Sequence, residues 1–377
     1  MDSELHRPLV GQRDAREQFN TPVLCIDLDA LERNIATMAD FGRASGVRLR
    51  PHAKTHKCVT IAQLQIAAGA VGQCCAKLGE AEALAAGGIR DLLITSPIVS
   101  APALTRLAKL RGFVERLAVV ADHPDNVAAL SAALHGSTLD VVIDIDPGSR
   151  RTGVSSAAAA LELHACIRAT PNLKFAGVQF YCGTQQHITT YAARRAAIAE
   201  RIDYLKSVLE QFQARGIDVP VGTGVGTGTH RIDAELRVFT EWQVGSYIFM
   251  DREYGDCELT PDASPAFEHA LFVDARVVSA NTIGMATVDA GLKAFASDAG
   301  VPTIVSGAPE QTSYRFMGDE HGLIVDPAGK HQWRLGELIR FVVPHCDPTV
   351  NLFDSYHVMR GDQLVAIWPI EARGRGR

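Results

Sequence analysis

Short runs of β-branched and aliphatic residues alternate along the chain with longer segments in which alanine and leucine recur at helical spacing. Nine such runs, each bounded by turn residues, occur between residues 24 and 249. Runs of this length are typical of strands, and helical segments between them are typical of the crossovers that join parallel strands. The pattern therefore predicts an α/β fold, and this many repeats favours a closed (β/α)8 barrel over an open sheet.

One of the nine runs is surplus, because a barrel of this type holds eight strands. The expected strands cover residues 24–29, 47–52, 71–76, 91–96, 116–121, 139–145, 174–181, 217–223 and 241–249. We assign the first of them to a different part of the molecule. The first barrel strand is then the second run in the chain.

After Asp251 the helical segments stop, and strand-like runs follow one another directly. This change of pattern predicts a separate C-terminal β-domain, which also takes the surplus strand from the N-terminal part of the chain. The expected limits are 30–251 for the barrel, and 1–29 with 252–377 for the β-domain.

Composition narrows the class of partner. The 377 residues are 47% hydrophobic, which is enough for two cores, and the net charge of −6 is spread without long runs. Neither nucleic acid nor an anionic membrane is therefore expected as a partner, and a small molecule is favoured. The polar N-terminal stretch, the lack of a long apolar run and eight cysteines without a CxxC pair predict a soluble cytoplasmic protein with reduced thiols.

The string RPHAKTHK, residues 50–57, directly follows the first expected barrel strand. Reactive groups of such barrels lie at the C-terminal ends of the strands, which makes Lys54 a candidate for covalent chemistry. A solvated loop lysine is the alternative, and the string alone does not decide between them.

The string TGVGTGT, Thr223–Thr229, follows a late barrel strand, and its glycines allow backbone N–H groups to converge on an anion. Glycine-rich turns are mostly structural, so this motif is weak by itself. A phosphate loop and a lysine at different strand ends of one barrel together suggest pyridoxal phosphate, with its phosphate in the loop and its aldehyde carbon bonded to Lys54.

The domain order and the strings RPHAKTHK, TGVGTGT and HCDPTVNL resemble the fold-type III pyridoxal-phosphate enzymes. Within these, the chain is similar to the group of metal-dependent D-threonine aldolases, 3-hydroxy-D-aspartate aldolases and eukaryotic-type D-serine dehydratases, from about residue 21 to the C-terminus. The resemblance implies an alanine-racemase-like barrel with a β-domain. It also implies a homodimer, in which the β-domain of one chain closes the barrel mouth of the other.

The resemblance assigns roles to residues of this chain. It implies that Lys54 is the Schiff-base lysine and that His187 is an acid/base group near the substrate hydroxyl. Further cofactor contacts are implied for Arg151, Tyr181, Thr223, Gly224, Gly226, Thr227, Gln243 and Tyr247. The two tyrosines could instead merely pack the barrel mouth, and this alternative stays open.

His345 and Asp347 are separated by one residue at the end of an expected strand, where a period of two would put both side chains on one face. An imidazole nitrogen and a carboxylate oxygen suit Mn²⁺, Zn²⁺ or Mg²⁺. Such pairs are common by chance, but the resemblance implies a metal site here, with Mn²⁺ favoured. Cys346 between them is expected to point into the core.

Several residues depart from the group's pattern. Val225 replaces a glycine of the phosphate loop, which we expect to be tolerated if the φ angle of Val225 is negative. Pro97, Cys182 and Phe353 are departures of another kind, at positions that could line the substrate pocket. Arg252 stands where relatives carry a small residue and could hold a second carboxylate of a substrate, although a solvated arginine is the favoured alternative.

The expected activity is pyridoxal-phosphate- and metal-dependent cleavage of a D-3-hydroxy-amino acid, of the D-threonine or 3-hydroxy-D-aspartate type, to glycine and an aldehyde. A dehydratase with the same parts would give a 2-oxo acid and ammonia instead. The aspartate at position 347 favours the aldolase, since the dehydratases typically carry cysteine there. A non-catalytic pyridoxal-phosphate carrier is a third possibility, but it would need neither the metal pair nor the β-domain.

Overall fold

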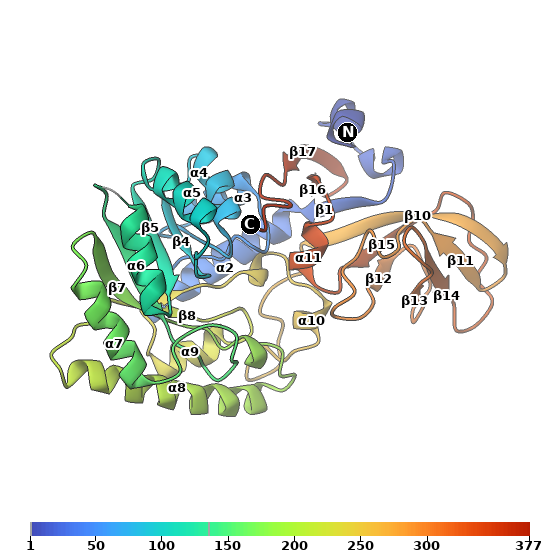
Figure 1. Ribbon diagram of the computed structural model, residues 1–377. Helices are drawn as coiled ribbons and strands as arrows, with labels where there is room; N and C mark the ends of the chain where they lie inside the picture. The colour runs from blue at the N-terminus through green and yellow to red at the C-terminus, as the bar shows by residue number, and fades with distance from the viewer. Residues whose placement is uncertain (1, 135) are drawn as a thin grey trace.

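The protein is described by a computed structural model, which covers residues 2–134 and 136–377 (Figure 1). Two sheets organise the chain: an eight-stranded parallel sheet and a nine-stranded, mainly antiparallel sheet. In Figure 1 the first carries the light blue to yellow helices around it, and the second forms the orange and red end of the molecule. This is the predicted barrel with a separate β-domain.

The parallel sheet contains all eight strands that were predicted for the barrel. They are β2 (Arg48–Leu49), β3 (Gln73–Cys75), β4 (Asp91–Ile94), β5 (Arg116–Ala121), β6 (Leu139–Asp144), β7 (Leu173–Phe180), β8 (Val221–Gly224) and β9 (Glu241–Trp242). Their order is β2-β9-β8-β7-β6-β5-β4-β3. A parallel bridge between His52 and Cys74, with a 2.8 Å hydrogen bond from Ala53 N to Cys74 O, joins the two end strands and closes the barrel.

Helices follow the strands, and several begin at the residue types that cap helices. The side chains of Ser100, Ser156 and Thr190 accept hydrogen bonds from backbone N–H groups of the first turn that follows them. The helices are α2 (Leu28–Ser45), α3 (Val59–Ala67), α4 (Leu78–Ala86), α5 (Ala101–Arg111), α6 (Pro124–Ala133), α7 (Ala157–Arg168), α8 (Tyr191–Gln213) and α9 (His230–Leu236), with the short α1 (Asp2–His6), α10 (Arg252–Gly255) and α11 (Cys346–Val350). None of the described helices is both long and apolar enough to cross a bilayer.

The second sheet includes the surplus strand, as predicted. Strand β1 (Val23–Asp27) pairs antiparallel with β10 (Leu271–Thr282) and parallel with β16 (Ser355–Arg360). The remaining strands are β11 (Met285–Val288), β12 (Thr303–Ser306), β13 (Ser313–Phe316), β14 (Gly322–Val325), β15 (Leu338–Val342) and β17 (Gln363–Pro369). β12 and β13 were not predicted, because both are short and largely exposed. The residue limits expected for the two domains stay a prediction.

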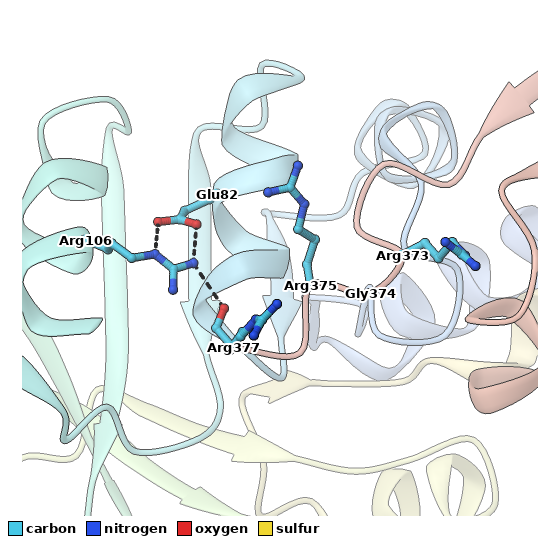
Figure 2. Close-up of a pocket in the computed structure, with 6 residues that line it drawn as sticks. All are labelled: Glu82, Arg106, Arg373, Gly374, Arg375 and Arg377. Atoms are coloured by element: carbon cyan, nitrogen blue, oxygen red, sulfur yellow. Dashed lines mark hydrogen bonds and ion pairs between the residues drawn. The ribbon is translucent and has the colours of Figure 1, made fainter. Parts of the chain in front are cut away.

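The last residues of the chain lie against the barrel rather than against the β-domain sheet. Arg377 O accepts a 3.1 Å hydrogen bond from Gly79 N at the start of α4. It accepts another of 3.1 Å from the Arg106 side chain on α5 (Figure 2). Glu82 on α4 in turn holds Arg106. This segment therefore connects the end of β17 to the outer helices beside β3 and β4.

Arg50 is a buried cation at the base of the barrel. It is 3% exposed, its Nε donates to Glu241 Oε1 at 2.9 Å, and its Nη1 donates to Asp91 Oδ1 at 2.6 Å. Glu241 begins β9 and Asp91 begins β4, so this network ties the N-terminal ends of the strands together, opposite the catalytic face of such barrels.

The Arg50 network yields a stability prediction. Replacing Arg50 with Met should lower the free energy of unfolding by about 3–5 kcal/mol, because two carboxylates lose their buried cation. The exposed pair of Arg33 and Glu268 supplies the control, and Arg33→Met should lower the free energy of unfolding far less, because an exposed ion pair contributes little to stability. Urea denaturation of both variants measures the difference, and equal losses would contradict a structural role for the Arg50 network.

Candidate active site

The string RPHAKTHK forms the turn after β2, and its histidine and lysine side chains make different contacts. His52 Nε2 lies 3.1 Å from Thr95 Oγ1, and His56 Nδ1 accepts from Cys58 N at 3.1 Å. Burial lowers the pKa of His52 to about 3 and that of His56 to about 4, so both rings are neutral and structural at neutral pH. Lys57 is buried and forms an ion pair with Glu80.

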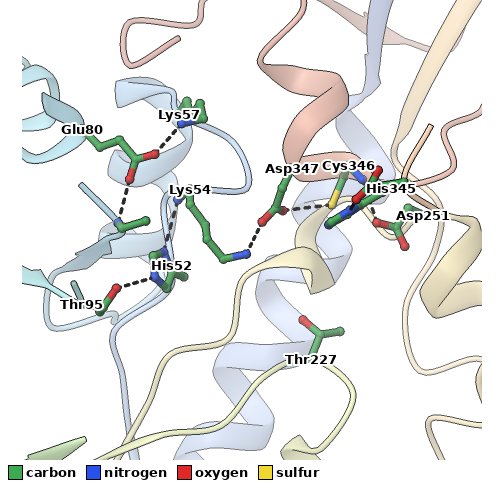
Figure 3. Close-up of polar contacts among 12 residues, drawn as sticks. His52, Lys54, Lys57, Glu80, Thr95, Thr227, Asp251, His345, Cys346 and Asp347 are labelled. Carbon is green, nitrogen blue, oxygen red and sulfur yellow. Dashed lines mark hydrogen bonds and ion pairs between the residues drawn. The ribbon is translucent and has the colours of Figure 1, made fainter. Parts of the chain in front are cut away.

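Lys54 differs from these neighbours, because its amine points into a pocket and pairs with Asp347 of the β-domain (Figure 3). Burial acts to lower the pKa of Lys54, but the Asp347 carboxylate outweighs it, and the pKa lies above its ordinary value. Burial likewise acts to raise the pKa of Asp347, and Lys54 and His345 outweigh it, so this pKa lies below its ordinary value. Both groups are therefore charged around neutral pH, and each is the counter-ion of the other.

His345 and Asp347 do not lie on a strand, which corrects the prediction. β15 ends at Val342, His345 is the extended residue that precedes α11, and Asp347 lies in the first turn of α11. The proximity of the two side chains is due to this tight turn and not to strand periodicity. Burial acts to lower the pKa of His345, but the carboxylates of Asp347, Asp298 and Asp251 together outweigh it, and the net effect raises the pKa.

Asp251 holds the turn in place from the end of the barrel. Its carboxylate is fully buried and accepts Cys346 N at 2.8 Å and Tyr254 N at 3.0 Å. Cys346 itself is fully buried, as expected. One carboxylate thus fixes the start of α10 and the start of α11 against each other.

The donor set of the turn fits a divalent metal ion. His345 Nδ1 is 2.7 Å from Asp298 Oδ2, an arrangement that orients a histidine and leaves its Nε2 as the metal donor. Asp347 supplies carboxylate oxygen beside it. In the described residues no group of three or more His, Cys, Asp or Glu side chains is arranged to hold an ion. These two residues could therefore supply only part of a coordination shell.

His187 follows the short 3₁₀ helix η3 (Gly183–Gln185) after β7. Its ring packs on Tyr254 at 4.4 Å between centroids, and its Nδ1 is 3.4 Å from Glu253 Oε1. Its Nε2 is buried and finds no hydrogen-bond acceptor or donor among the described residues. Burial lowers the pKa of His187, so the ring is neutral and able to accept a proton at neutral pH.

Tyr181, at the end of β7, lies near Lys54, since the two groups affect each other's pKa. Burial raises the pKa of Tyr181, which keeps its hydroxyl protonated at neutral pH. The Arg151 guanidinium lies 5.8 Å from the centre of the Tyr181 ring. Tyr181 therefore adjoins the predicted Schiff-base lysine, and Arg151 lies beside Tyr181.

The phosphate loop differs from its prediction at Val225. The φ angle of Val225 is +71°, in the left-handed region, whereas we expected a negative value. A β-branched residue in this region costs about 1–2 kcal/mol relative to ordinary backbone conformations. Val225 is almost completely buried, and its packed side chain offsets part of this cost.

Close packing against backbone requires glycine at position 224, and at position 226 a Cβ atom would displace the Gln186 side chain. A Cβ atom on Gly224 would lie 2.2 Å from Phe180 O, and one on Gly226 would lie 2.3 Å from Gln186 Oε1. Gln186 Oε1 also accepts Gly228 N at 3.0 Å. The loop therefore packs tightly on the segment that carries His187, and a role in holding phosphate stays a prediction.

The other predicted cofactor residues form internal hydrogen bonds. Gln243 donates to Thr223 Oγ1 at 3.1 Å, and Thr227 Oγ1 accepts Tyr247 N at 2.9 Å. The Tyr247 hydroxyl accepts a 3.0 Å hydrogen bond from Gln65 of α3 and is almost fully buried, as the packing alternative requires. These contacts order the barrel interior below Lys54, and cofactor roles for the four residues stay predictions.

A pocket of about 530 Å³ includes Lys54, His345 and Asp347 in its lining. Arg252 is not part of this lining. Its guanidinium donates to Ala299 O and lies 3.4 Å from Asp256 Oδ2. The structure thus places Arg252 in support of the loop that carries Asp298, and not in the pocket.

Sequence reasoning missed Asp251, Asp298 and the C-terminal residues beside the pocket. Asp298 is 47 residues from His345 along the chain, and nothing in its local sequence marks the contact. Asp251 was used only as a domain limit. The alternation of arginine and glycine over residues 373–377 is a signal in the sequence that marks this segment.

Comparisons with known proteins match both parts of the chain. The alanine racemase N-terminal domain family matches residues 26–253, and the putative serine dehydratase domain family matches residues 270–359. A 3-hydroxy-D-aspartate aldolase of Paracoccus denitrificans is 38% identical over 95% of this chain and 93% of its own length. A D-threo-3-hydroxyaspartate dehydratase of Delftia is 31% identical over 94% of this chain and 98% of its own length.

The structure of D-threonine aldolase from Filomicrobium marinum superposes with a TM-score of 0.90 at 39% identity, covering 95% of this chain and 96% of that one. The fold is that of the fold-type III pyridoxal-phosphate enzymes. The chain belongs to the alanine racemase N-terminal domain family, joined to a serine dehydratase-type β-domain.

The lysines of the site have different surroundings, and a labelling experiment can therefore distinguish them. After loading with pyridoxal phosphate and reduction with borohydride, peptide mass spectrometry should find the phosphopyridoxyl group on Lys54. Lys57 should stay unmodified because Glu80 pairs with its buried amine. Lys54→Ala should abolish the label and Lys77→Ala should keep it, whereas a label on Lys57 or Lys77 in the wild-type protein would contradict the assignment.

Proposed function

We propose that this protein is a pyridoxal-phosphate- and divalent-metal-dependent aldolase that cleaves D-3-hydroxy-amino acids, of the D-threonine or 3-hydroxy-D-aspartate type, to glycine and an aldehyde. One observation carries the proposal: the amine of Lys54, at the catalytic end of the barrel, meets the Asp347 carboxylate of the β-domain in one pocket. The similarity to aldolases of these two kinds over more than nine-tenths of the chain supports it.

Lys54 would hold the cofactor, with Tyr181 and Arg151 beside it and the loop of Thr223, Gly224, Gly226 and Thr227 assigned to the phosphate. Pyridoxal phosphate supplies an electron sink for the electron pair of the broken Cα–Cβ bond. Gln243 and Tyr247 hold the barrel interior around this position through the hydrogen bonds described above.

His345 Nε2 and Asp347 would hold the divalent ion, which we propose to be Mn²⁺, with Mg²⁺ or Zn²⁺ as alternatives. Such an ion lowers the pKa of a hydroxyl group bound to it. Asp298 orients the His345 ring, and Asp251 fixes the turn that carries both donors. The role of the protein here is to present one nitrogen and one oxygen donor on the side of the pocket that faces Lys54.

His187 is the group that would accept the proton of the β-hydroxyl. Its Nε2 is buried and unbonded among the described residues, its ring is neutral, and the charges of Lys54, His345 and Asp347 act on its pKa. Tyr254 and Glu253 hold the ring in one orientation. Because the His187 ring is already neutral at neutral pH, it can accept the proton of the hydroxyl group directly.

The dehydratase alternative uses the same parts, and the family includes enzymes named for that reaction. Aspartate at position 347 and the higher identity to the aldolase favour carbon–carbon cleavage. A homodimer in the cytoplasm completes the proposal, and both of these points rest on the resemblance and on composition.

Product analysis decides between the two reactions. Purified protein supplied with pyridoxal phosphate and Mn²⁺ should release glycine and acetaldehyde from D-threonine, and glycine and glyoxylate from 3-hydroxy-D-aspartate. Chromatography of the amino acids with an aldehyde assay measures this outcome. Ammonia and a 2-oxo acid in equal amounts, without glycine, would show that the protein is a dehydratase.

Metal removal separates the two halves of the site. Chelation, His345→Ala and Asp347→Ala should each reduce glycine release by at least about 100-fold, because the hydroxyl pKa is no longer lowered. Bound cofactor, followed by its absorbance, should remain in all three samples. Addition of Mn²⁺ should restore glycine release by the chelated wild-type enzyme but not by either variant.

The two variants should also differ from each other, since only Asp347 touches Lys54. Asp347→Ala should lower the pKa of the free Lys54 amine in the cofactor-free protein, which the pH dependence of its reaction with an amine-selective reagent would detect, and His345→Ala should change it less. Full glycine release by the chelated enzyme would show that His345 and Asp347 are structural.

A further inference from the structure

Residues 371–377, here called the strap, run from the end of β17 along the mouth of the barrel. Ala372 N donates to Lys57 O at 3.0 Å, directly beside the string that carries Lys54. Gly374 N donates to Asn351 Oδ1 of the β-domain at 3.0 Å. The strap therefore crosses the junction of barrel and β-domain at the level of the proposed active site.

The far end of the strap is fixed on the barrel helices. Arg106 donates to Arg377 O (Figure 2). Gly79 N donates to the same oxygen, and a Cβ atom on Gly79 would lie 2.6 Å from it. This close approach requires glycine at position 79. The strap is thus anchored at both ends and has a defined path.

The strap forms part of the wall of the pocket that holds Lys54 and Asp347. Gly374 and Gly376 line that pocket, together with Lys77 from the end of β3. A second pocket, of about 510 Å³, shares Gly374 and is lined by the strap arginines. A ligand that enters the Lys54 pocket along this side passes the strap.

The positive charge of this wall is not neutralised within the described parts of the chain. Arg373 pairs with Asp354, and Arg106 pairs with Glu82. Arg375, Arg377 and Lys77 are exposed, and no described carboxylate lies within ion-pair distance of them. Lys77 lines the Lys54 pocket, and Arg375 and Arg377 line the second pocket, which shares Gly374 with it. Three cations without a carboxylate partner among the described residues therefore lie beside the Lys54 pocket, in a protein whose net charge is −6.

We propose that Arg375 and Arg377 of the strap, with Lys77, form a carboxylate-recruiting wall that favours dicarboxylic 3-hydroxy-amino acids over neutral ones. This inference rests on the proposed function. D-Threonine carries no net charge at neutral pH, whereas 3-hydroxyaspartate carries one negative charge. The positive wall therefore attracts 3-hydroxyaspartate and not D-threonine. Arg252, the residue first considered for this task, is engaged with Ala299 and Asp256 instead.

The test compares two double variants with the same change in net charge. Arg375→Gln/Arg377→Gln removes the wall, and Arg168→Gln/Arg215→Gln removes two exposed arginines at the C-terminal ends of α7 and α8, on the side of the barrel away from its mouth. At low salt the first should lower kcat/KM for 3-hydroxy-D-aspartate by about 3–10-fold, while kcat/KM for D-threonine changes less than about 2-fold. Near 1 M salt the difference should vanish, because the screening length falls to about 3 Å. The control variant should behave as wild type.

Equilibrium binding tests the strap independently of cleavage. D-Aspartate and D-asparagine have nearly the same shape, differ by one negative charge and lack the hydroxyl, so calorimetry can measure both with the cofactor-loaded protein. The Arg375→Gln/Arg377→Gln variant should bind D-aspartate with an affinity lower by about 3–10-fold than wild type. Its affinity for D-asparagine should fall by less than about 2-fold. An equal effect on both ligands, or no effect on either, would overturn the proposal. Wild-type protein that binds D-aspartate preferentially but releases no glycine from any substrate would instead refute the proposed function and leave the strap assignment standing.

Discussion

The contact between Lys54 and Asp347 is the interaction on which the site depends. It joins a lysine at the end of the first barrel strand to a carboxylate that lies 293 residues later, in the β-domain. A partly buried charge pair of this kind is stable only while both members are present, since removal of one leaves an uncompensated charge. The two domains therefore have to be positioned accurately against each other for either residue to be in its proper state.

The rest of the structure provides that positioning. Asp251 fixes the start of α11 from the barrel side, and Asp298 fixes the ring of His345. The strap crosses the same junction and bonds to both Lys57 O and Asn351. The site is consequently a product of the domain junction and belongs to neither domain alone.

Much of the fold was predictable from the sequence, for a physical reason. Buried parallel strands are continuous apolar runs, so the strand beginning at Leu139 and its neighbours could be recognised in the sequence. Nine such runs exceed the eight strands of a barrel, and this excess assigned the run beginning at Leu24 to the β-domain. The short exposed strands beginning at Thr303 and Ser313 have no such pattern and were missed.

The site was predictable where a motif carried it and not where a turn decided the geometry. The place of Lys54 after a strand made it a candidate, the resemblance assigned it the Schiff-base role, and that role stays a prediction. His345 and Asp347 were paired for the wrong reason, since they flank the start of a helix. The left-handed backbone of Val225 was also not foreseen, because a valine in sequence argues against a positive φ. Contacts such as that of Asp298 with His345 join distant segments, and only the tertiary structure shows them.

The most direct test of the account is anomalous diffraction at the manganese edge from crystals grown with pyridoxal phosphate and Mn²⁺. The account predicts one anomalous peak within bonding distance of His345 Nε2 and an Asp347 oxygen, with cofactor density continuous with Lys54 in the same pocket. A peak elsewhere, or cofactor density on another lysine, would contradict the claim that barrel and β-domain build one site.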